Sequence, residues 1–270
     1  MNEALGIIAG NGEFPLILAR EARQHGIARI VAAAFDGETS REIEQRADEV
    51  EWVKIGQLNK LIEVFTSRGV TRAVMAGGIT PSNLFKNLRL DFRMMAVAGK
   101  LKVRNAETIF GAIADELGKD GVTLLDPRPF LGDSVPKAGN LTRGKPDKQQ
   151  EVDIAYGLKI AKEVSRLDIG QTVVVKEGTV LAVEGFEGTD ECIRRGGTLA
   201  GEKGGAVVVK VSKPNQDFRF DIPCVGQNTV ESCAAGKIAV LAIEAGSCLL
   251  LDKDTILRAA EKCDLQITAV

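Results

Sequence analysis

Histidine is almost absent from this sequence of 270 residues, which contains only His25. Zinc sites with several histidines, two-histidine iron sites and histidine–aspartate phosphotransfer arrays are therefore excluded. A Ser-His-Asp or Cys-His pair would need His25, which stands at the end of a predicted helix just before Gly26. A cation there faces the negative end of the helix dipole and glycine ends the helix, so we interpret His25 as structural.

Paired cysteines and long apolar runs are also missing. The five cysteines all lie in the second half and none is spaced C-x-x-C, so we expect buried thiols in a reducing cytosol. The N-terminus has no basic region followed by a cleavage site, and runs such as 238–243 are too short to cross a bilayer. We expect a soluble cytoplasmic protein.

The balance of charge does not favour nucleic acid as a partner, because the net charge is only −2. Hydrophobic residues at 44% and charged residues at 27% are typical of globular proteins. A chain of this size buries about 70% of its surface on folding, without needing a disulfide or metal. Catalysis would have to use carboxylates, Lys or Arg, backbone amides and a hard metal ion.

The first half alternates predicted strands with predicted helices. The strands span 4–9, 30–35, 50–53, 72–76 and 122–125, and the helices span 15–25, 57–67, 91–103 and 106–117. This alternation predicts an α/β, Rossmann-like domain over residues 1–130, with a parallel sheet covered by helices on both faces.

The second half follows a different pattern. Residues 126–148 hold four of the eight prolines, which predicts a linker or an ordered crossing loop, and we place the linker at 131–148. A smaller α+β domain is predicted over 149–270. Its helices span 149–164, 189–195, 228–236 and 253–262, and its strands 172–176, 180–184, 206–211, 239–243 and 248–251.

Two glycine turns are candidates for a nucleotide site. Gly10-Asn11-Gly12-Glu13-Phe14-Pro15 follows the first strand, and Gly77-Gly78 follows the fourth. Both should lie at the carboxyl edge of the parallel sheet, where ligands collect. Pro15 occupies the place of the third glycine in the dinucleotide fingerprint, although Asp36 could supply its acidic residue. A tight turn without ligand is the alternative interpretation.

Acidic residues gather in two stretches of the second half. Glu184, Glu187 and Asp190 lie within seven residues, more than the capping of one helix requires. Further on, Asp217, Arg219 and Asp221 alternate, so an extended segment would place them on one face. Together the acids predict an oxygen-ligated Mg²⁺ site acting on an anionic substrate, with a carboxylate as general base. A solvated salt-bridge ladder is the alternative.

Three segments resemble a known family over essentially the full length of the chain. They are GIIAGNGEFP at the start, DIGQTVVVKEGTVLAVEGFEGTDECIRR in the middle and VVVKVSKPNQDFRFDIPCVGQNTVE later. They are similar to the bacterial UDP-2,3-diacylglucosamine diphosphatases of the LpxI type, which act in lipid A synthesis.

The resemblance implies a UDP-binding N-terminal domain and a C-terminal domain that binds the diacylglucosamine phosphate. It further implies Mg²⁺-dependent hydrolysis to UMP and 2,3-diacylglucosamine 1-phosphate, with water attacking the phosphorus nearer the sugar. Asp221 is then the essential acid, and Lys210 and Arg219 clamp the pyrophosphate. Asp217 joins these catalytic candidates, and Asp221, Asp190 and Glu187 are the predicted metal ligands. The predicted substrate-binding residues are Gly10, Asn11, Gly12, Phe14, Pro15, Gly77, Gly78, Gln171, Thr189, Gln216 and Thr229.

The lipid-linked substrate also predicts peripheral contact with the inner membrane, and a homodimer stays open. Two other classes of function remain as alternatives. One is a nucleotide-sugar oxidoreductase that uses the first glycine turn. The other is a non-catalytic module that binds UDP-sugars or lipid.

Overall fold

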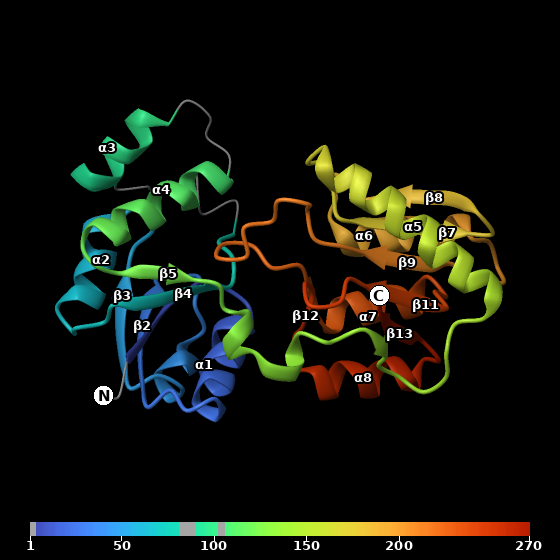
Figure 1. Ribbon diagram of the computed structural model, residues 1–270, viewed down its shortest axis with the longest axis horizontal. Helices are drawn as coiled ribbons and strands as arrows, with labels where there is room; N and C mark the ends of the chain where they lie inside the picture. Colours follow the sequence, from blue (N-terminus) through green and yellow to red (C-terminus); the bar gives the residue numbers. More distant parts are fainter. Residues whose placement is uncertain (1–3, 81–89, 102–105) are drawn as a thin grey trace. The chain divides into compact units, whose positions relative to one another are not determined.

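The computed structural model describes residues 4–80, 90–101 and 106–270, except for the side chains of residues 106 and 107. The chain forms two compact units, whose elements Figure 1 labels. The first unit comprises Met1–Gly132 together with Asp217–Phe220, and the second comprises Asp133–Gln216 with Asp221–Val270. The units are nearly equal in length.

The first unit contains a five-stranded, all-parallel sheet in the order β3-β2-β1-β4-β5. Its strands are β1 (Ala4–Ala9), β2 (Arg29–Phe35), β3 (Glu49–Val53), β4 (Arg72–Ala76) and β5 (Thr123–Leu125). This order is that of a Rossmann-type sheet, so the predicted fold class is confirmed.

Helices cover both faces of this sheet. On one face α1 (Phe14–Gln24) and the 3-10 helix η1 (Arg41–Gln45) pack on apolar residues of β2 such as Ala32. On the other face lie α2 (Leu58–Thr66), α3 (Phe92–Lys100) and α4 (Ala106–Lys119), whose apolar side chains pack on Val31 and Ala33. The end of the helix predicted over 91–103 falls outside the described residues.

The second unit contains a six-stranded mixed sheet in the order β6-β13-β11-β9-β7-β8. The three strands β9 (Val207–Lys210), β11 (Val240–Ile243) and β13 (Gln266–Ala269) are parallel to one another. Of the remaining strands, β6 (Gly139–Asn140) is antiparallel to β13, and β7 (Thr172–Lys176) is antiparallel to both β9 and β8 (Thr179–Val183).

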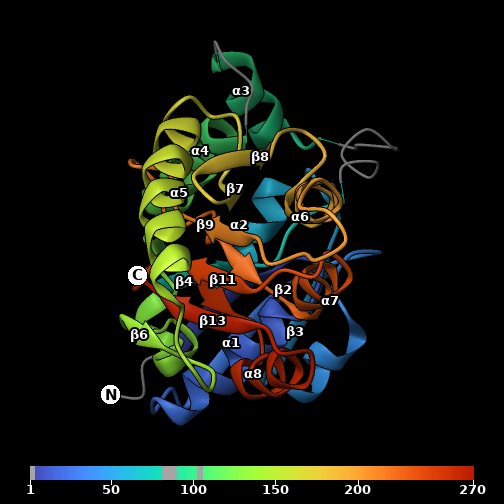
Figure 2. The same cartoon turned by 90° about the vertical axis from the view of Figure 1, so that its right-hand side faces the viewer.

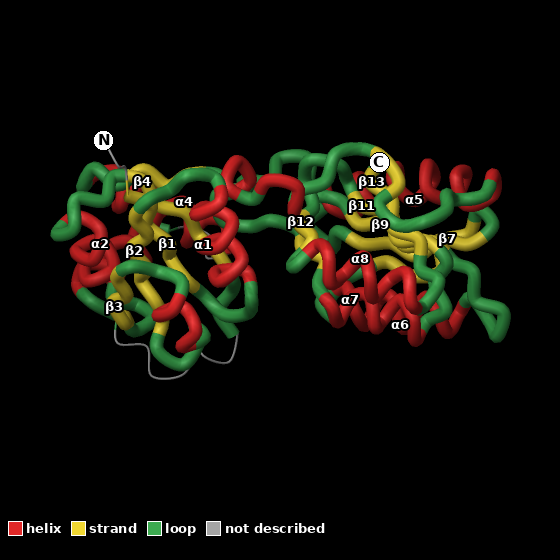
Figure 3. The backbone as a smooth tube through the Cα atoms, turned by 90° about the horizontal axis from the view of Figure 1, so that it is seen from below, coloured by secondary structure: helices red, strands yellow, loops and turns green. Residues whose placement is uncertain are grey.

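One long helix covers one face of this sheet and three shorter helices cover the other (Figures 2 and 3). The long helix is α5 (Lys148–Arg166), which packs on Val173, Val207 and Val209. The opposite layer consists of α6 (Thr189–Leu199), α7 (Gln227–Ala235) and α8 (Lys253–Lys262), which enclose Val174, Val208 and Leu241.

Several elements of the second unit differ from the prediction. The strand predicted over 248–251 is only β12 (Leu249–Leu250), and it pairs with β10 (Cys224–Val225) in a separate two-stranded sheet. The strands β6, β10 and β13 were not predicted, because each spans two to four residues and shows little periodicity. Within the predicted linker, Leu131 is fully buried, and Gly139–Asn140 pairs with Ala269 and Thr268 of β13.

The helix α6 continues to Leu199, beyond its predicted end at residue 195, and two glycines lie in this additional turn. A Cβ on Gly196 would lie 2.6 Å from Cβ of Val174 in β7, and one on Gly197 would lie 2.4 Å from Cα of Gly236. These glycines therefore let α6 approach both the sheet and the end of α7 closely. The predicted helix ended too early because glycine lowers helix propensity, whereas close packing favours it here.

We expect Gly197→Ala to lower the free energy of unfolding by about 1–3 kcal/mol, because the added methyl group would overlap Gly236. The matched control is Gly111→Ala in α4, where an added Cβ has no atom within 4 Å. That change should stabilise the protein by about 0.5–1 kcal/mol through helix propensity. Urea denaturation of both variants checks this pair, and equal effects would contradict the packing argument.

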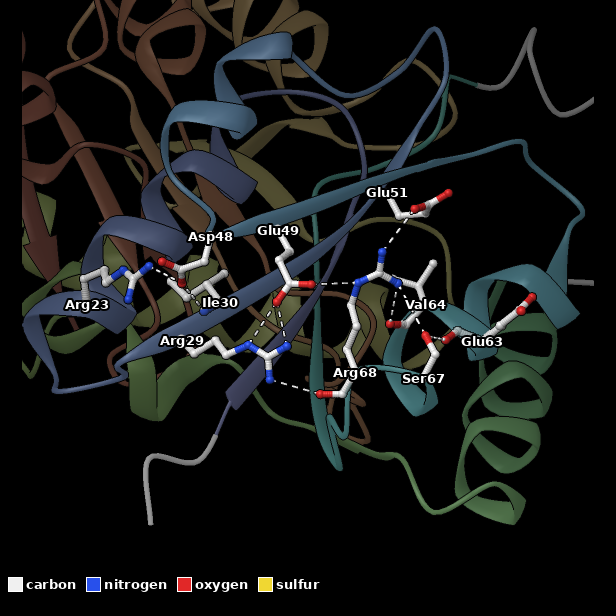
Figure 4. A network of polar contacts seen from close by, with 10 residues as sticks. All are labelled: Arg23, Arg29, Ile30, Asp48, Glu49, Glu51, Glu63, Val64, Ser67 and Arg68. Atoms are coloured by element: carbon white, nitrogen blue, oxygen red, sulfur yellow. Dashed lines mark hydrogen bonds and ion pairs between the residues drawn. The ribbon is translucent and has the colours of Figure 1, made fainter.

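Charged side chains line the edge strand β3 (Figure 4). Glu49 accepts hydrogen bonds from Arg29 Nη2 at 2.6 Å and Arg68 Nε at 3.0 Å, and Arg68 Nη2 donates to Glu51 at 3.1 Å. Charges along an exposed edge oppose pairing with a strand of another molecule. The hydrogen bonds from Arg29 are the main cause that lowers the pKa of Glu49.

The lowered pKa predicts how this network depends on pH. A carboxylate whose pKa is lower in the folded state stabilises the fold above its ordinary pKa, here 4.5, and this contribution is lost as pH falls through the folded-state pKa. We expect Glu49→Gln to lower the urea midpoint slightly at pH 7 and low salt, with no difference from wild type at pH 2. A difference that is the same at both pH values would contradict the electrostatic origin.

Candidate functional site

A buried lysine lies at the end of the central strand β9. Lys210 is 8% exposed, and its Nζ donates a hydrogen bond to Thr189 Oγ1 at 2.8 Å. No ion pair of Lys210 with a carboxylate occurs in the described part of the chain. A buried charge without an opposite charge is costly, so this position favours an anionic ligand.

Two open cavities meet at Lys210. One has a volume of about 460 Å³ and is lined by Glu187, Thr189, Asp190 and Thr229, among others. The other measures about 310 Å³, with Gln171, Glu184, Lys213 and Asp221 among its lining residues. Lys210 and Cys224 line both cavities, so the first acidic stretch and Asp221 of the second border adjoining spaces.

The first turn of α6 supplies one wall of the larger cavity. Gly188 precedes this helix with a φ of 84°, a conformation that glycine adopts without strain. Thr189 and Asp190 follow, and Asp190 Oδ1 accepts a hydrogen bond from Thr229 Oγ1 at 3.1 Å. The positive end of the helix dipole adds to the attraction of Lys210 for anions.

Asp221 is held in the smaller cavity by a neighbouring amide. Gln216 Nε2 donates to Asp221 Oδ2 at 2.8 Å and to its backbone oxygen at 2.9 Å. Gln216 Oε1 in turn accepts the Lys213 backbone N–H at 2.9 Å, and the Lys213 side chain pairs with Asp168. The Gln171 Oε1 atom is buried and has no hydrogen-bond donor among the described residues.

The predicted metal ligands differ in how far their carboxylates are already engaged. Glu187 pairs with Arg195, whose hydrogen bond lowers the pKa of Glu187. Over residues 4–80, 90–101 and 106–270, no three His, Cys, Asp or Glu side chains are grouped as a metal site. Asp190 lines the larger cavity and Asp221 lines the smaller one.

Cys224 borders both cavities but does not supply a thiolate. Burial raises the pKa of its thiol to about 12, and its Sγ donates to the Ile222 backbone oxygen at 3.1 Å. This thiol therefore stays protonated at neutral pH.

The prediction that Asp217, Arg219 and Asp221 share one face of an extended segment is wrong. Residues 217–220 form a turn closed by a 3.1 Å hydrogen bond from the Phe220 N–H to the Asp217 oxygen. The Asp217 carboxylate accepts hydrogen bonds from Arg219 Nε at 2.9 Å and Nη2 at 2.7 Å. The hydrogen bonds from Arg219 lower the pKa of Asp217, which is paired within the turn.

This turn belongs to the first unit, whereas Asp221 belongs to the second. The Phe218 ring lies under the Arg128 guanidinium, 3.5 Å from its Cζ, and the Phe220 ring lies 6.2 Å from that of Phe110. These contacts anchor the turn that carries Asp217 and Arg219 to the first unit. The spacing of residues did not indicate this turn, because Arg128 and Phe110, which contact its two rings, lie far from it in the chain.

The two glycine turns of the first unit do meet at the carboxyl edge of its sheet. The Asn11 N–H donates to the Gly78 oxygen at 2.8 Å, and a Cβ on Gly10 would lie only 2.3 Å from that oxygen. Asn11 Nδ2 donates to Glu38 Oε2 at 3.0 Å and to Thr80 Oγ1 at 3.1 Å.

Other predicted residues of this edge have different surroundings. Gly12 has a φ of 78° and open space around it, whereas Phe14 and Pro15 begin α1 and are buried. Glu38 was not predicted. Its position just after the second strand could have indicated it, but the acidic residue there was predicted to be Asp36.

The fold and the site together define a two-unit α/β protein with a Rossmann-type sheet in the first unit and two cavities around a buried lysine in the second. The model of the LpxI N-terminal domain matches residues 4–134 and that of the LpxI C-terminal domain matches residues 137–268. The chain belongs to the LpxI family.

The comparison with one relative agrees with this assignment. The chain is 31% identical to the UDP-2,3-diacylglucosamine pyrophosphatase LpxI of Caulobacter vibrioides, over 98% of this chain and 97% of that protein. Solved structures that match include a biotin carboxylase domain of a thermophilic 2-oxoglutarate carboxylase, at 14% identity and a TM-score of 0.26, covering 63% of this chain and 34% of that one. The corresponding Hydrogenobacter thermophilus domain matches at 12% identity and a TM-score of 0.28, covering 73% and 41% of the two chains.

These structural scores are too low to support an argument about fold or function. In the described part of the chain, no helix combines the length and apolar character that a bilayer crossing requires.

We expect Lys210→Met to weaken the binding of inorganic pyrophosphate by about tenfold or more, because hydrogen bonds to a charged group contribute about 1.5–3 kcal/mol. The stability of the fold should stay equal or rise, since a buried charge is removed. Lys159→Met, at an exposed position of α5, is the matched control. Titration calorimetry and thermal unfolding check both effects, and unchanged affinity would exclude Lys210 from the anion site.

Proposed function

We propose that this protein is an enzyme of lipid A biosynthesis that hydrolyses the pyrophosphate bond of UDP-2,3-diacylglucosamine. The products are UMP and 2,3-diacylglucosamine 1-phosphate. The observation that carries the proposal is the full-length similarity to the Caulobacter pyrophosphatase, at 31% identity. The cavities around Lys210 support it, because a diphosphate ester offers the negative charge that this buried cation lacks.

Lys210 is proposed to bind oxygens of the diphosphate. Negative charge is spread over the phosphoryl oxygens in the transition state. A fixed ammonium group in a buried position stabilises this charge more than the same group exposed to water would. The N-terminus of α6 adds backbone dipoles to the same cavity.

Asp221 is proposed to accept the proton of the attacking water. The water oxygen forms a bond to the phosphorus nearer the sugar, and the bond from that phosphorus to the bridging oxygen breaks, releasing UMP. Gln216 would orient the Asp221 carboxylate, because its amide donates to Oδ2 at 2.8 Å.

Mg²⁺ is part of the proposal, with Asp190 and Asp221 as the carboxylates that would hold it. When bound, the ion would polarise a phosphoryl oxygen and lower the pKa of a water molecule. Glu187 is a weaker candidate ligand, since Arg195 already pairs with its carboxylate.

The remaining parts of the substrate are assigned by the same proposal. The glycine turns at Gly10 and Gly77 would bind UDP. The two acyl chains require apolar contact, and Ile169, which is 53% exposed and lines the smaller cavity, is suited to provide it. Peripheral contact with the inner membrane and the cytoplasmic location follow from such a substrate.

We expect Asp221→Asn to lower the rate of UMP release at least about a hundredfold, the usual contribution of a general base. Asp254→Asn, at an exposed position of α8, is the control and should remain active. Turnover near the wild-type rate in a folded Asp221→Asn protein would contradict the role of this residue. A rate that survives an excess of chelator would remove the metal from the proposal.

The same assay run in isotopically heavy water tests the site of attack. The solvent oxygen should be recovered in the sugar 1-phosphate and not in UMP. Recovery of the label in UMP would assign the attack to the other phosphorus.

A further inference from the structure

Three polar side chains from separate elements form a linear chain of hydrogen bonds that ends at the buried cation. Glu184 follows β8, Thr189 begins α6 and Lys210 ends β9. Thr189 Oγ1 donates to Glu184 Oε1 at 2.8 Å and accepts from Lys210 Nζ at 2.8 Å. Glu184 therefore acts on Lys210 through the threonine hydroxyl.

The donors and acceptors in this chain allow only one arrangement. A hydroxyl group has one hydrogen, and a carboxylate and an ammonium group are, respectively, only an acceptor and only a donor. The Thr189 hydrogen must therefore point to Glu184, and its oxygen must face Lys210. One of the three ammonium N–H groups of Lys210 is engaged in this way, and the others are available to a ligand in the cavities.

Both carboxylate oxygens of Glu184 are used. Oε2 accepts the backbone N–H of Gln171 at 3.0 Å, while Oε1 accepts the Thr189 hydroxyl. The two loops are in close contact, since a Cβ on Gly170 would lie 2.2 Å from the Glu184 backbone oxygen. The carboxylate is thus fixed at both ends.

We propose that Glu184 is a positioning residue that fixes the Thr189 hydroxyl and thereby holds the Lys210 ammonium group against the phosphate oxygens of the ligand. The identity of the ligand as a diphosphate ester rests on the proposed function. The positioning of Lys210 by Glu184 and Thr189 does not depend on that function.

Glu184→Gln is the sharpest test, because an amide has only one acceptor oxygen. If the amide oxygen of the new glutamine accepts the Gln171 N–H, its NH₂ group faces Thr189 and competes with Lys210 for the Thr189 hydroxyl oxygen. If the oxygen accepts from Thr189, the NH₂ opposes the Gln171 N–H. Glu184→Asp keeps two acceptors and should retain more function. Glu163→Gln, whose carboxylate is exposed and pairs with Arg166, is the matched control.

In the turnover assay we expect Glu184→Gln and Thr189→Val to lower kcat by about tenfold to a hundredfold, a larger effect than the several-fold rise in KM that weaker anion binding brings, as misplacement of a catalytic group does. Thr189→Ser, which keeps the hydroxyl, should restore kcat. The double variant Glu184→Gln/Thr189→Val should be no slower than Thr189→Val alone, because the glutamate acts through the threonine. Additive losses would overturn the proposal.

Binding of inorganic pyrophosphate gives a readout without turnover. Removing the negative charge of Glu184 would tighten anion binding if the charge acted only through space, whereas loss of positioning weakens it. We expect affinity to fall several-fold in both Glu184→Gln and Thr189→Val, with Thr189→Ser and Glu163→Gln near wild type. Tighter binding by Glu184→Gln would overturn the proposal.

The two measurements separate this inference from the proposed function. Wild-type protein that binds pyrophosphate but does not cleave UDP-2,3-diacylglucosamine would contradict the proposed function alone. Should Glu184→Gln fail to fold, Glu184→Asp decides: affinity equal to wild type despite a shortened side chain would overturn the positioning role, and weaker binding would support it.

Discussion

The buried charge of Lys210 is the constraint on which the architecture of the second unit depends. Placing an ammonium group at the end of a central strand removes it from water, and no carboxylate of the described residues pairs with it directly. Its ammonium group donates a hydrogen bond to a neutral hydroxyl, that of Thr189, at 2.8 Å. A buried charge is unfavourable for stability, and under the proposed function the diphosphate of the substrate would offset that cost.

The surrounding elements are arranged so that this charge is reached from several sides. Gly196 and Gly197 allow α6 to pack closely on β7 and α7, and the first turn of α6 carries Thr189 to Lys210. The loop after β8 brings Glu184 to the same hydroxyl, and Gln216 holds Asp221 at the edge of the smaller cavity. The close packing of Gly196 and Gly197 thus helps to set the position of Thr189 beside Lys210 at the cavities.

Much of this arrangement could be predicted from the sequence because it is local. Hydrophobic periodicity located β1, β4 and α8 with their observed bounds, and the first acidic stretch and Asp221 of the second border adjoining cavities. The conformation of residues 217–220 could not be predicted, because it depends on Phe218 and Phe220 meeting Arg128 and Phe110. The role of Glu184 was equally hidden, since a hydrogen-bond chain through Thr189 leaves no pattern in the spacing of residues.

The turn at Asp217–Phe220 has a consequence for how the protein is made. Neither unit is a continuous stretch of chain, because this turn completes the first unit from within the second half. During synthesis from the N-terminus, the first unit cannot acquire all its aromatic contacts until residue 220 has left the ribosome. The first 132 residues expressed alone would lack Phe218 and Phe220, and the remainder would expose these rings to water. The ribosome therefore releases two structural units whose folding is coupled in time, although each has its own core.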